Sequence, residues 1–117
     1  MTSDWPRPLV HWSIVAVDAD KQRSFYSQLF NWDIGDGPFM SIEAGIGAPE
    51  GGAAGHIQAG AVPGVSLYVQ VRNLRDSLDL AVELGGKEVM PPFDLPNGQT
   101  LAAIEDPEGN FLMLVQQ

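Results

Sequence analysis

The chain has 117 residues, of which 44% are hydrophobic and 18% charged, a composition typical of a single globular domain with one core. Six Lys and Arg against 15 Asp and Glu give a net charge of −9. This charge argues against nucleic acid and anionic membranes as partners, because both are bound through clustered cations. The absence of cysteine excludes disulfides, thiolate metal sites and thiol nucleophiles. No segment approaches the roughly 18 apolar residues of a membrane span, and the N-terminus lacks the apolar region of a signal peptide, so we expect a soluble, cytoplasmic protein.

The first half begins with a predicted strand and helix. Leu9–Val17 is rich in β-branched and aromatic residues and alternates with a period of two, which puts His11 and Ser13 on one face and Trp12 and Ile14 on the other. A helix is expected over Asp20–Phe30, capped by Asp18 or Asp20, with an apolar face made of Phe25, Tyr26, Leu29 and Phe30. Further strands are expected at residues 38–44 and 56–59. The five glycines of the intervening segment 45–55 indicate either a surface loop or a lid over a pocket.

The second half repeats this order. Ser66–Val71 predicts a strand, Asn73 an N-cap, Leu74–Leu84 a helix and Gly85-Gly86 a left-handed helix stop. A strand at 87–90 is then expected to break at Pro91-Pro92, and two more strands are expected at 99–105 and 111–116, around a turn at 106–110.

A shift of 55 residues superposes the two halves without a gap. It carries Trp12, Ile14 and Ala16 onto Leu67, Val69 and Val71, and Asp18 onto Asn73. Sequence identity between the halves is negligible, but the alternation and the cap positions agree. The chain therefore contains an internal repeat.

Four motifs in this order resemble the vicinal oxygen chelate superfamily, which includes glyoxalase I, extradiol dioxygenases, and the bleomycin and fosfomycin resistance proteins. They are Val10-His11-Trp12, residues 25–32 (FYSQLFNW), Gly85-Gly86 and residues 105–111 (EDPEGNF). The resemblance covers nearly the whole chain and implies one α+β domain over residues 1–117. This domain would consist of two βαβββ modules, at about 8–60 and 64–117, forming a cup-shaped mixed sheet with helices on its convex face. It also implies a homodimer.

Metal-dependent members of that superfamily hold their ion with two His and two Glu, or two His and one Glu. The resemblance assigns the first-strand ligand to His11, the ligand that opens the second module to Ser66, and the final-strand ligand to Met113. His56 and Gln58 are both candidates for the remaining position. Because a hydroxyl and a thioether are poor ligands for Zn, Ni or Fe(II), we expect no metal or other cofactor. His11 and His56 would be ligands only if such a divalent metal is found.

We therefore expect metal-free binding of a small organic molecule in the concave cavity, in the mode of the bleomycin resistance proteins. Polar groups there would orient a largely apolar guest. The expected lining residues are His11, Ser13, His56, Gln58, Ser66, Tyr68, Gln70 and Met113. Tyr68 and Met113 could instead fill the core, and His11 could be a structural histidine. The alternative function is a glyoxalase-like lyase or isomerase with His11 or His56 as acid or base, which would be metal-dependent only if His11 and His56 recruit a carboxylate.

Overall fold

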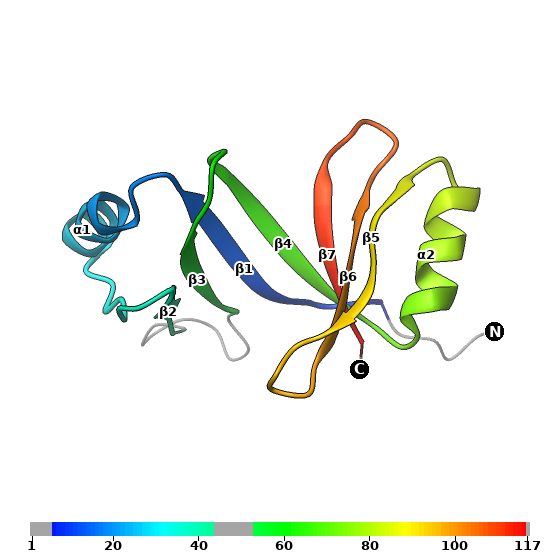
Figure 1. Cartoon of the computed structure of the whole chain (residues 1–117), viewed down its shortest axis with the longest axis horizontal. Helices are drawn as coiled ribbons and strands as arrows, with labels where there is room; N and C mark the ends of the chain where they lie inside the picture. Colours follow the sequence, from blue (N-terminus) through cyan, green and yellow to red (C-terminus); the bar gives the residue numbers. More distant parts are fainter. Residues whose placement is uncertain (1–5, 44–52, 117) are drawn as a thin grey trace. The chain divides into compact units, whose positions relative to one another are not determined.

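The computed structural model describes residues 6–43 and 53–116. Its elements, in chain order, are β1 (Leu9–Ala16), α1 (Ala19–Phe30), β2 (Phe39–Ile42), β3 (Ala54–Ala59), β4 (Gly64–Val71), α2 (Leu74–Glu83), β5 (Lys87–Asp94), β6 (Thr100–Glu105) and β7 (Phe111–Gln116) (Figure 1). The strands form a mixed sheet in the order β2-β3-β1-β4-β7-β6-β5, which confirms the α+β class. Residues 45–52 of the predicted loop or lid lie outside the described residues. Over the two described ranges, no helix is long and apolar enough to cross a membrane.

The chain divides into two compact units. We call His11–Ser66 the N-half unit, and Leu67–Gln117 together with Met1–Val10 the C-half unit. The boundaries lie within β1 and β4. Pro8 accordingly lies in the C-half unit, where the backbone N–H of Gln70 donates to its carbonyl at 2.9 Å.

The two helices begin in the same way, 55 residues apart. Asp18 caps α1 by accepting a hydrogen bond from the backbone N–H of Lys21 at 3.1 Å. Asn73 caps α2 by accepting one from the backbone N–H of Asp76 at 2.9 Å. Both side chains satisfy a donor that the first turn of a helix leaves unpaired. The predicted repeat is thus confirmed at its caps, and Asp18, rather than Asp20, is the first of them.

The strand pairing also repeats. In the N-half unit β1 runs parallel to β3, with Trp12 opposite Gly55. In the C-half unit β4 runs parallel to β7, with Leu67 opposite Leu112. Each last strand then pairs in antiparallel fashion with the strand before it, β2 with β3 and β6 with β7. The two units therefore share one pattern of backbone hydrogen bonds.

The N-half core lies between α1 and one face of its strands. Its buried members are Ala16, Ile34, Met40, Ile42 and Ile57, with Trp12, Ile14, Ala19, Tyr26 and Trp32 packed against them. From α1 only Ala19 and Tyr26 reach this core. The prediction that one apolar face of this helix packs on the core is wrong in part, because Phe25, Leu29 and Phe30 are 52–58% exposed. The helix turns its tyrosine inward instead and leaves the other three apolar side chains at its flank.

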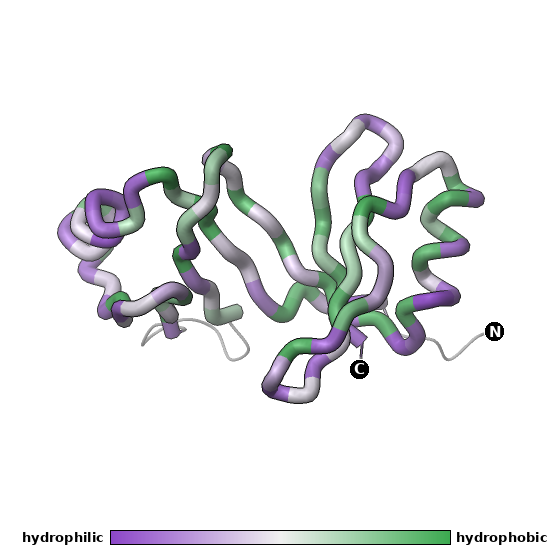
Figure 2. The backbone as a smooth tube through the Cα atoms, viewed as in Figure 1, coloured by the Kyte–Doolittle hydropathy of each residue, from purple (hydrophilic) through white to green (hydrophobic). Residues whose placement is uncertain are grey.

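The C-half core lies under α2, which packs over β5, β6 and β7 (Figure 1). Leu74 and Leu78 of the helix are almost fully buried against Val71, Ala102 and Leu114. Figure 2 shows β6 and β7 as largely hydrophobic along their length, whereas α1 is mostly hydrophilic. Strands β6 and β7 are buried on both faces, with Ala102 and Leu114 under α2 and Leu101, Ala103, Met113 and Val115 in a second cluster.

Strand β5 corrects one prediction. The sequence indicated a break at Pro91-Pro92, but β5 continues through both prolines to Asp94. The pairing with β6 shifts register on either side of Met90, between Glu88 and Met90 and again between Met90 and Phe93. Because β5 is the last strand of the sheet order, its prolines remove no ladder hydrogen bond on the outer side, and edge strands and bulges are where proline is tolerated.

Candidate functional site

A polar face lies on the N-half sheet, on the side away from α1. The β-register puts His56 opposite Ser13 of β1 and opposite Ser41 of β2, and the period of two adds His11 and Gln58 to the same side. The residues between them, such as Trp12 and Ile57, point to the core under α1. We call His11, Ser13, Ser41, His56 and Gln58 the polar face.

Three of these side chains form a hydrogen-bonded row. His11 Nε2 lies 2.7 Å from His56 Nδ1, and His56 Nε2 lies 2.6 Å from Gln58 Oε1. The two imidazoles meet edge to edge through the His11–His56 bond, with ring centroids 5.0 Å apart and planes inclined by 29°. All three side chains are half-buried, and Ser13, at the centre of the face, is only 2% exposed. The row is a preorganised set of polar groups that is still accessible from one side.

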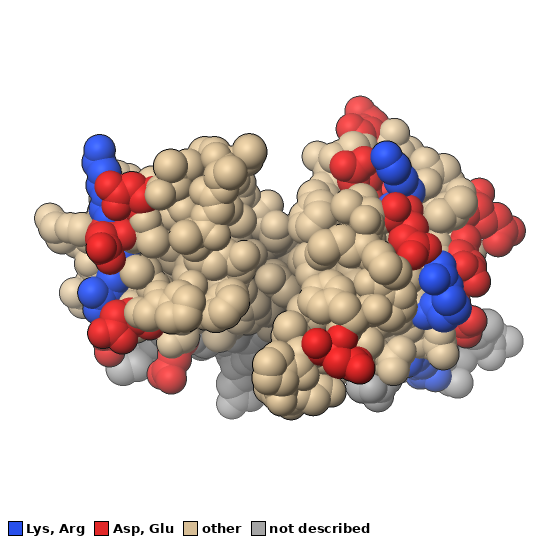
Figure 3. Space-filling view, viewed as in Figure 1, with Lys and Arg blue, Asp and Glu red and all other residues tan. Residues whose placement is uncertain are grey.

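The surroundings of the row carry no formal charge from its own strands. None of β1, β2 and β3 contains Asp, Glu, Lys or Arg. On the face that Figure 3 shows, the charged side chains of this unit lie along its outer margin, over α1 and below it. Burial lowers the pKa of His11 below its usual value, and repulsion from His56 lowers this pKa further. Both effects favour the neutral form of the His11 imidazole, which lies on strands without a charged side chain.

Gly55 and Trp12 hold the strand that carries His56. A Cβ on Gly55 would lie 2.3 Å from Cδ2 of Trp12, well inside van der Waals contact. The indole crosses the strand at this point and donates its Nε1–H to the carbonyl of Ala53 at 3.1 Å. Only glycine leaves room for this contact, so the Trp12 indole excludes a side chain at position 55, next to His56.

The other predicted site residues divide between the two units. Ser66 is half-buried at the end of the N-half unit, and Tyr68 and Gln70 are half-buried on β4 in the C-half unit. Met113 is 6% exposed, within an apolar cluster that includes Leu101, Ala103 and Val115, with Tyr68 packed against it. Met113 is thus core filler within its unit, the alternative that the sequence had left open.

The register also resolves the position that the sequence could not align. Ser13 lies 55 residues before Tyr68, and Ser13 pairs with His56 as Tyr68 pairs with Met113. His56, and not Gln58, therefore occupies the N-half counterpart of the Met113 position. The polar face of one unit corresponds to an apolar face of the other.

This donor set does not fit the metal centre that the superfamily implies. Both nitrogens of His56 are engaged, one with His11 and one with Gln58, so the pair does not present two imidazole lone pairs to one ion. Within residues 6–43 and 53–116, no three His, Asp or Glu side chains gather closely enough to hold a metal ion. Transition-metal sites in proteins normally require three protein ligands.

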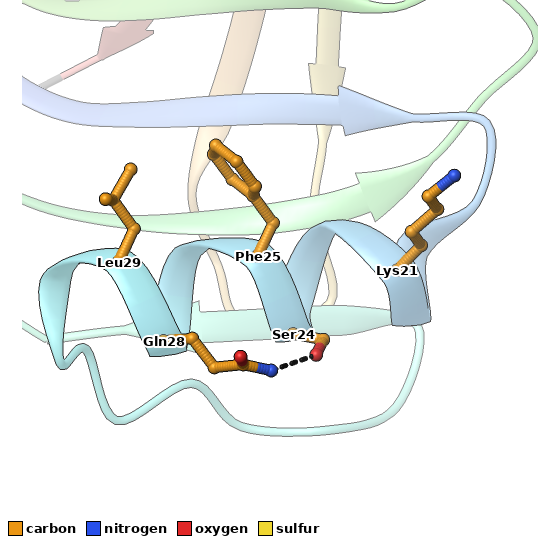
Figure 4. A pocket seen from close by; sticks show the side chains of 5 residues that line it. All are labelled: Lys21, Ser24, Phe25, Gln28 and Leu29. Carbon is orange, nitrogen blue, oxygen red and sulfur yellow. Dashed lines mark hydrogen bonds between the residues drawn. The ribbon is translucent and has the colours of Figure 1, made fainter.

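A shallow, open hollow lies along α1 and is lined by Lys21, Ser24, Phe25, Gln28 and Leu29. Figure 4 shows Lys21, Phe25 and Leu29 projecting from one side of the helix, while Gln28 Nε2 donates to Ser24 Oγ at 2.8 Å. A single helix supplies every lining residue, and none of the eight predicted site residues takes part. We therefore take the polar face, rather than this hollow, as the candidate site.

Two neighbours of the row were not predicted from the sequence. Phe39 packs its ring edge-on to His56 at a centroid distance of 5.7 Å, and Ser41 lies opposite His56 in the ladder. Both residues belong to the short strand expected at 38–44, but no local pattern specifies which residue of another strand they face. That information lies only in the β2–β3 register.

Three comparisons with known proteins place the chain among its relatives. Residues 11–115 match the model of a family described as the glyoxalase-like domain. Among solved structures, a hypothetical protein from Bacillus halodurans C-125 aligns with a TM-score of 0.68 at 12% identity, over 95% of this chain and 94% of that chain. A glyoxalase/bleomycin resistance protein/dioxygenase superfamily member from Vibrio splendidus 12B01 aligns with a TM-score of 0.66 at 13% identity, over 96% and 100%. Methylmalonyl-CoA epimerase from Mycobacterium tuberculosis aligns with a TM-score of 0.61 at 15% identity, over 92% and 86%. No curated protein sequence matches the chain.

Proposed function

The chain belongs to the glyoxalase-like domain family, and on that premise we propose that it binds a small organic molecule at the polar face of the N-half unit without the help of a metal ion. The observation that carries this proposal is the row His11–His56–Gln58, whose two hydrogen bonds of 2.7 and 2.6 Å preorganise half-buried polar groups on a face that no helix of its unit covers. Family membership alone would not indicate this function, since one fold supports many chemistries.

Binding without a metal ion follows from the chemistry of the donors. Half-buried imidazole and amide groups in an uncharged setting can orient a ligand through hydrogen bonds, which is how most small-molecule pockets obtain specificity. The same groups offer a transition metal too few lone pairs and no carboxylate from their own strands.

Two measurements test this proposal together. Elemental analysis of protein purified without chelator should find Zn, Ni and Fe well below one ion per chain, whereas one tightly held ion per chain would refute binding without a metal. A thermal-shift screen with aromatic metabolites, aldehyde adducts and cationic antibiotics should find ligands that stabilise the protein. The stabilisation should disappear in His56→Ala and persist in Ser24→Ala, which alters only the hollow on α1.

A second candidate is an isomerase acting next to a carbonyl group, which the lowered pKa of His11 favours. An imidazole that is neutral at neutral pH can accept a proton. Proton exchange at the α-carbon of methylmalonyl-CoA in deuterated water tests this candidate, because a similar structure is a methylmalonyl-CoA epimerase. Exchange that depends on His11 would favour the isomerase over the binding protein.

The homodimer that the superfamily resemblance implies remains part of the proposal. Its test is the mass of the chain in solution, measured by light scattering over a range of concentrations.

A further inference from the structure

Asn97 and Gly98 lie in the turn that joins β5 to β6 (Figure 1). The backbone N–H of Gly98 donates to the carbonyl of Leu95 at 3.0 Å, and the N–H of Leu95 donates to the carbonyl of Gln99 at 2.7 Å. These two bonds close a turn with Pro96 and Asn97 at its centre, followed by Gly98 at a φ of +91°. Asn97, Gly98 and Gln99 are all exposed, so water reaches the turn.

The side chain of Asn97 is held beside the backbone that follows it. Its Oδ1 accepts a hydrogen bond from the backbone N–H of Gln99 at 3.0 Å, and its Nδ2 donates to Gln99 Oε1 at 3.1 Å. The backbone nitrogen of Gly98 is separated from Asn97 Cγ by four covalent bonds, so a bond between them closes a five-membered ring. Glycine carries no Cβ that would crowd this approach.

We propose that Asn97 is a site of spontaneous deamidation, in which the backbone nitrogen of Gly98 is the nucleophile. A base in the solvent takes the proton of the Gly98 N–H, and the nitrogen then attacks Asn97 Cγ. The new bond from nitrogen to Cγ replaces the bond from Cγ to Nδ2, which takes up a proton and leaves as ammonia. The product of this step is a cyclic imide within the backbone.

Water then opens the imide at one of its two carbonyl carbons. Attack at Cγ breaks the bond from Cγ to nitrogen and gives aspartate, whereas attack at the backbone carbonyl carbon gives isoaspartate, in which the main chain runs through the former side chain. The overall reaction consumes one water, releases one ammonia and adds one negative charge to the net charge of −9. It needs no oxidant or reductant.

Two hydrogen bonds of the turn act on this reaction in opposite directions. Negative charge develops on Asn97 Oδ1 during the attack, and the N–H of Gln99 already donates to this oxygen. The N–H of Gly98, in contrast, must leave the carbonyl of Leu95 before its proton can be removed. A neutral hydrogen bond changes a rate by up to about tenfold, so we expect the turn to deamidate within about tenfold of the rate in a free peptide of residues 93–101.

The other three asparagines, Asn31, Asn73 and Asn110, lack this arrangement. They are followed by Trp, Leu and Phe, whose side chains crowd the attacking nitrogen. The side chains of Asn73 and Asn110 are also occupied, because Asn73 caps α2 and Asn110 donates to Asp106. These residues are internal controls within the same molecule.

Isoaspartate at position 97 would open this end of the β5–β6 hairpin. It adds one carbon atom to the main chain between Leu95 and Gln99, the two residues that the turn's hydrogen bonds hold together. Leu95 packs against the buried cluster that contains Leu101 and Met113. Deamidation should therefore loosen one side of the C-half core. None of the residues of the polar face takes part, so this proposal does not depend on the proposed function.

The test is to incubate the folded protein at pH 8 and to locate the exchange of NH₂ for OH by peptide mass spectrometry with fragmentation. Isoaspartate is detected by methyl transfer from S-adenosylmethionine with a protein isoaspartate methyltransferase. We expect conversion at position 97, with isoaspartate among the products, and none at the other three asparagines over the same time. Conversion more than about tenfold slower than in the free peptide would overturn the proposal.

Two alanine variants test the nucleophile. Gly98→Ala should slow conversion at position 97 at least several-fold, because its Cβ crowds the attacking nitrogen. Gly109→Ala is the matched control and should leave the rate unchanged, since both glycines have a φ of +91° and a Cβ on either would meet nothing within 4 Å. An unchanged rate in Gly98→Ala, or equal slowing in both variants, would overturn the role of the Gly98 nitrogen.

Asn97→Gln decides the question if Gly98→Ala does not fold. It keeps a side-chain amide at the same exposed position, but attack on this amide would have to close a larger, less favourable ring. We expect conversion at position 97 to stop in this variant. Conversion at the rate of the unchanged protein would mean direct hydrolysis of the amide by water and would overturn the proposal.

Discussion

Replacing Gly55 by alanine should destabilise the N-half unit and disturb the polar face beside it. The added Cβ would lie 2.3, 2.4 and 2.6 Å from three atoms of the Trp12 indole, where ordinary contacts are 3.4–4 Å. The ring is rigid, contacts Trp32 at a centroid distance of 5.5 Å, and donates to the carbonyl of Ala53, so it can yield only by losing contacts. Overpacking costs about 1–3 kcal/mol, and the lost hydrogen bond costs about 0.5–1.5 kcal/mol. The stiffer unfolded chain offsets about 0.4–1 kcal/mol of this.

The net expectation is a loss of about 1–4 kcal/mol in the free energy of unfolding. Urea denaturation followed by tryptophan fluorescence measures this loss, because the displaced ring is itself a reporter. Gly64→Ala is the matched control, since a Cβ at Gly64 would meet nothing within 4 Å and the residue does not have a positive φ. A Gly55→Ala protein as stable as Gly64→Ala would refute the claim that the indole leaves no room for a Cβ at position 55.

Three further predictions concern one helix cap and two titratable groups. Asn73→Ala should cost about 1 kcal/mol of unfolding free energy in urea, and Asn73→Asp only a few tenths, because only alanine leaves the N–H of Asp76 without its cap. Hydrogen bonds that Asn110 donates to the Asp106 carboxylate hold the pKa of Asp106 below its usual value. The stabilisation by this carboxylate is therefore present above about pH 4 and is lost as pH falls through its lower folded-state pKa. In Asp106→Ala, the melting temperature should depend less on pH in that acidic range than it does in the unchanged protein. The pKa of His11 is also lowered, so stability should begin to fall as pH drops below about 6.5, and His11→Gln should remove that slope. An unchanged pH profile in either variant would contradict its assignment.

The parts of the fold that depend on neighbouring residues could be predicted from the sequence. The caps at Asn73 and Asp18, the left-handed Gly85 and the turn glycine Gly109 all follow from local backbone chemistry. The φ angles of these glycines, +99° and +91°, are ones that residues with a Cβ rarely adopt. Local rules therefore suffice to detect the repeat and, through it, the fold.

Features that depend on distant pairing could not be predicted in the same way. The choice between His56 and Gln58 for the last position required the β1–β3 register, which joins residues 43 positions apart across a segment without local landmarks. The continuation of β5 through Pro91-Pro92 required its place at the edge of the sheet, which the order of strands reveals and a proline pair does not. The side of α1 that faces the core was not predicted, for a similar reason. Helical spacing shows which apolar residues share a face of the helix, but it does not decide which face meets the sheet.

The C-half unit serves as an internal control for the meaning of the polar face. It has the same backbone pairing, yet places Met113 where the N-half unit places His56, and surrounds it with Leu101, Ala103 and Val115. The shared architecture therefore does not require an imidazole at this position. A half-buried polar row must offset the desolvation of each of its groups, whereas an apolar cluster contributes burial directly. The polar row is therefore a departure that the shared backbone pairing does not require. Such departures are expected at binding and catalytic sites, which is why we assign the function to this face rather than to the hollow on α1.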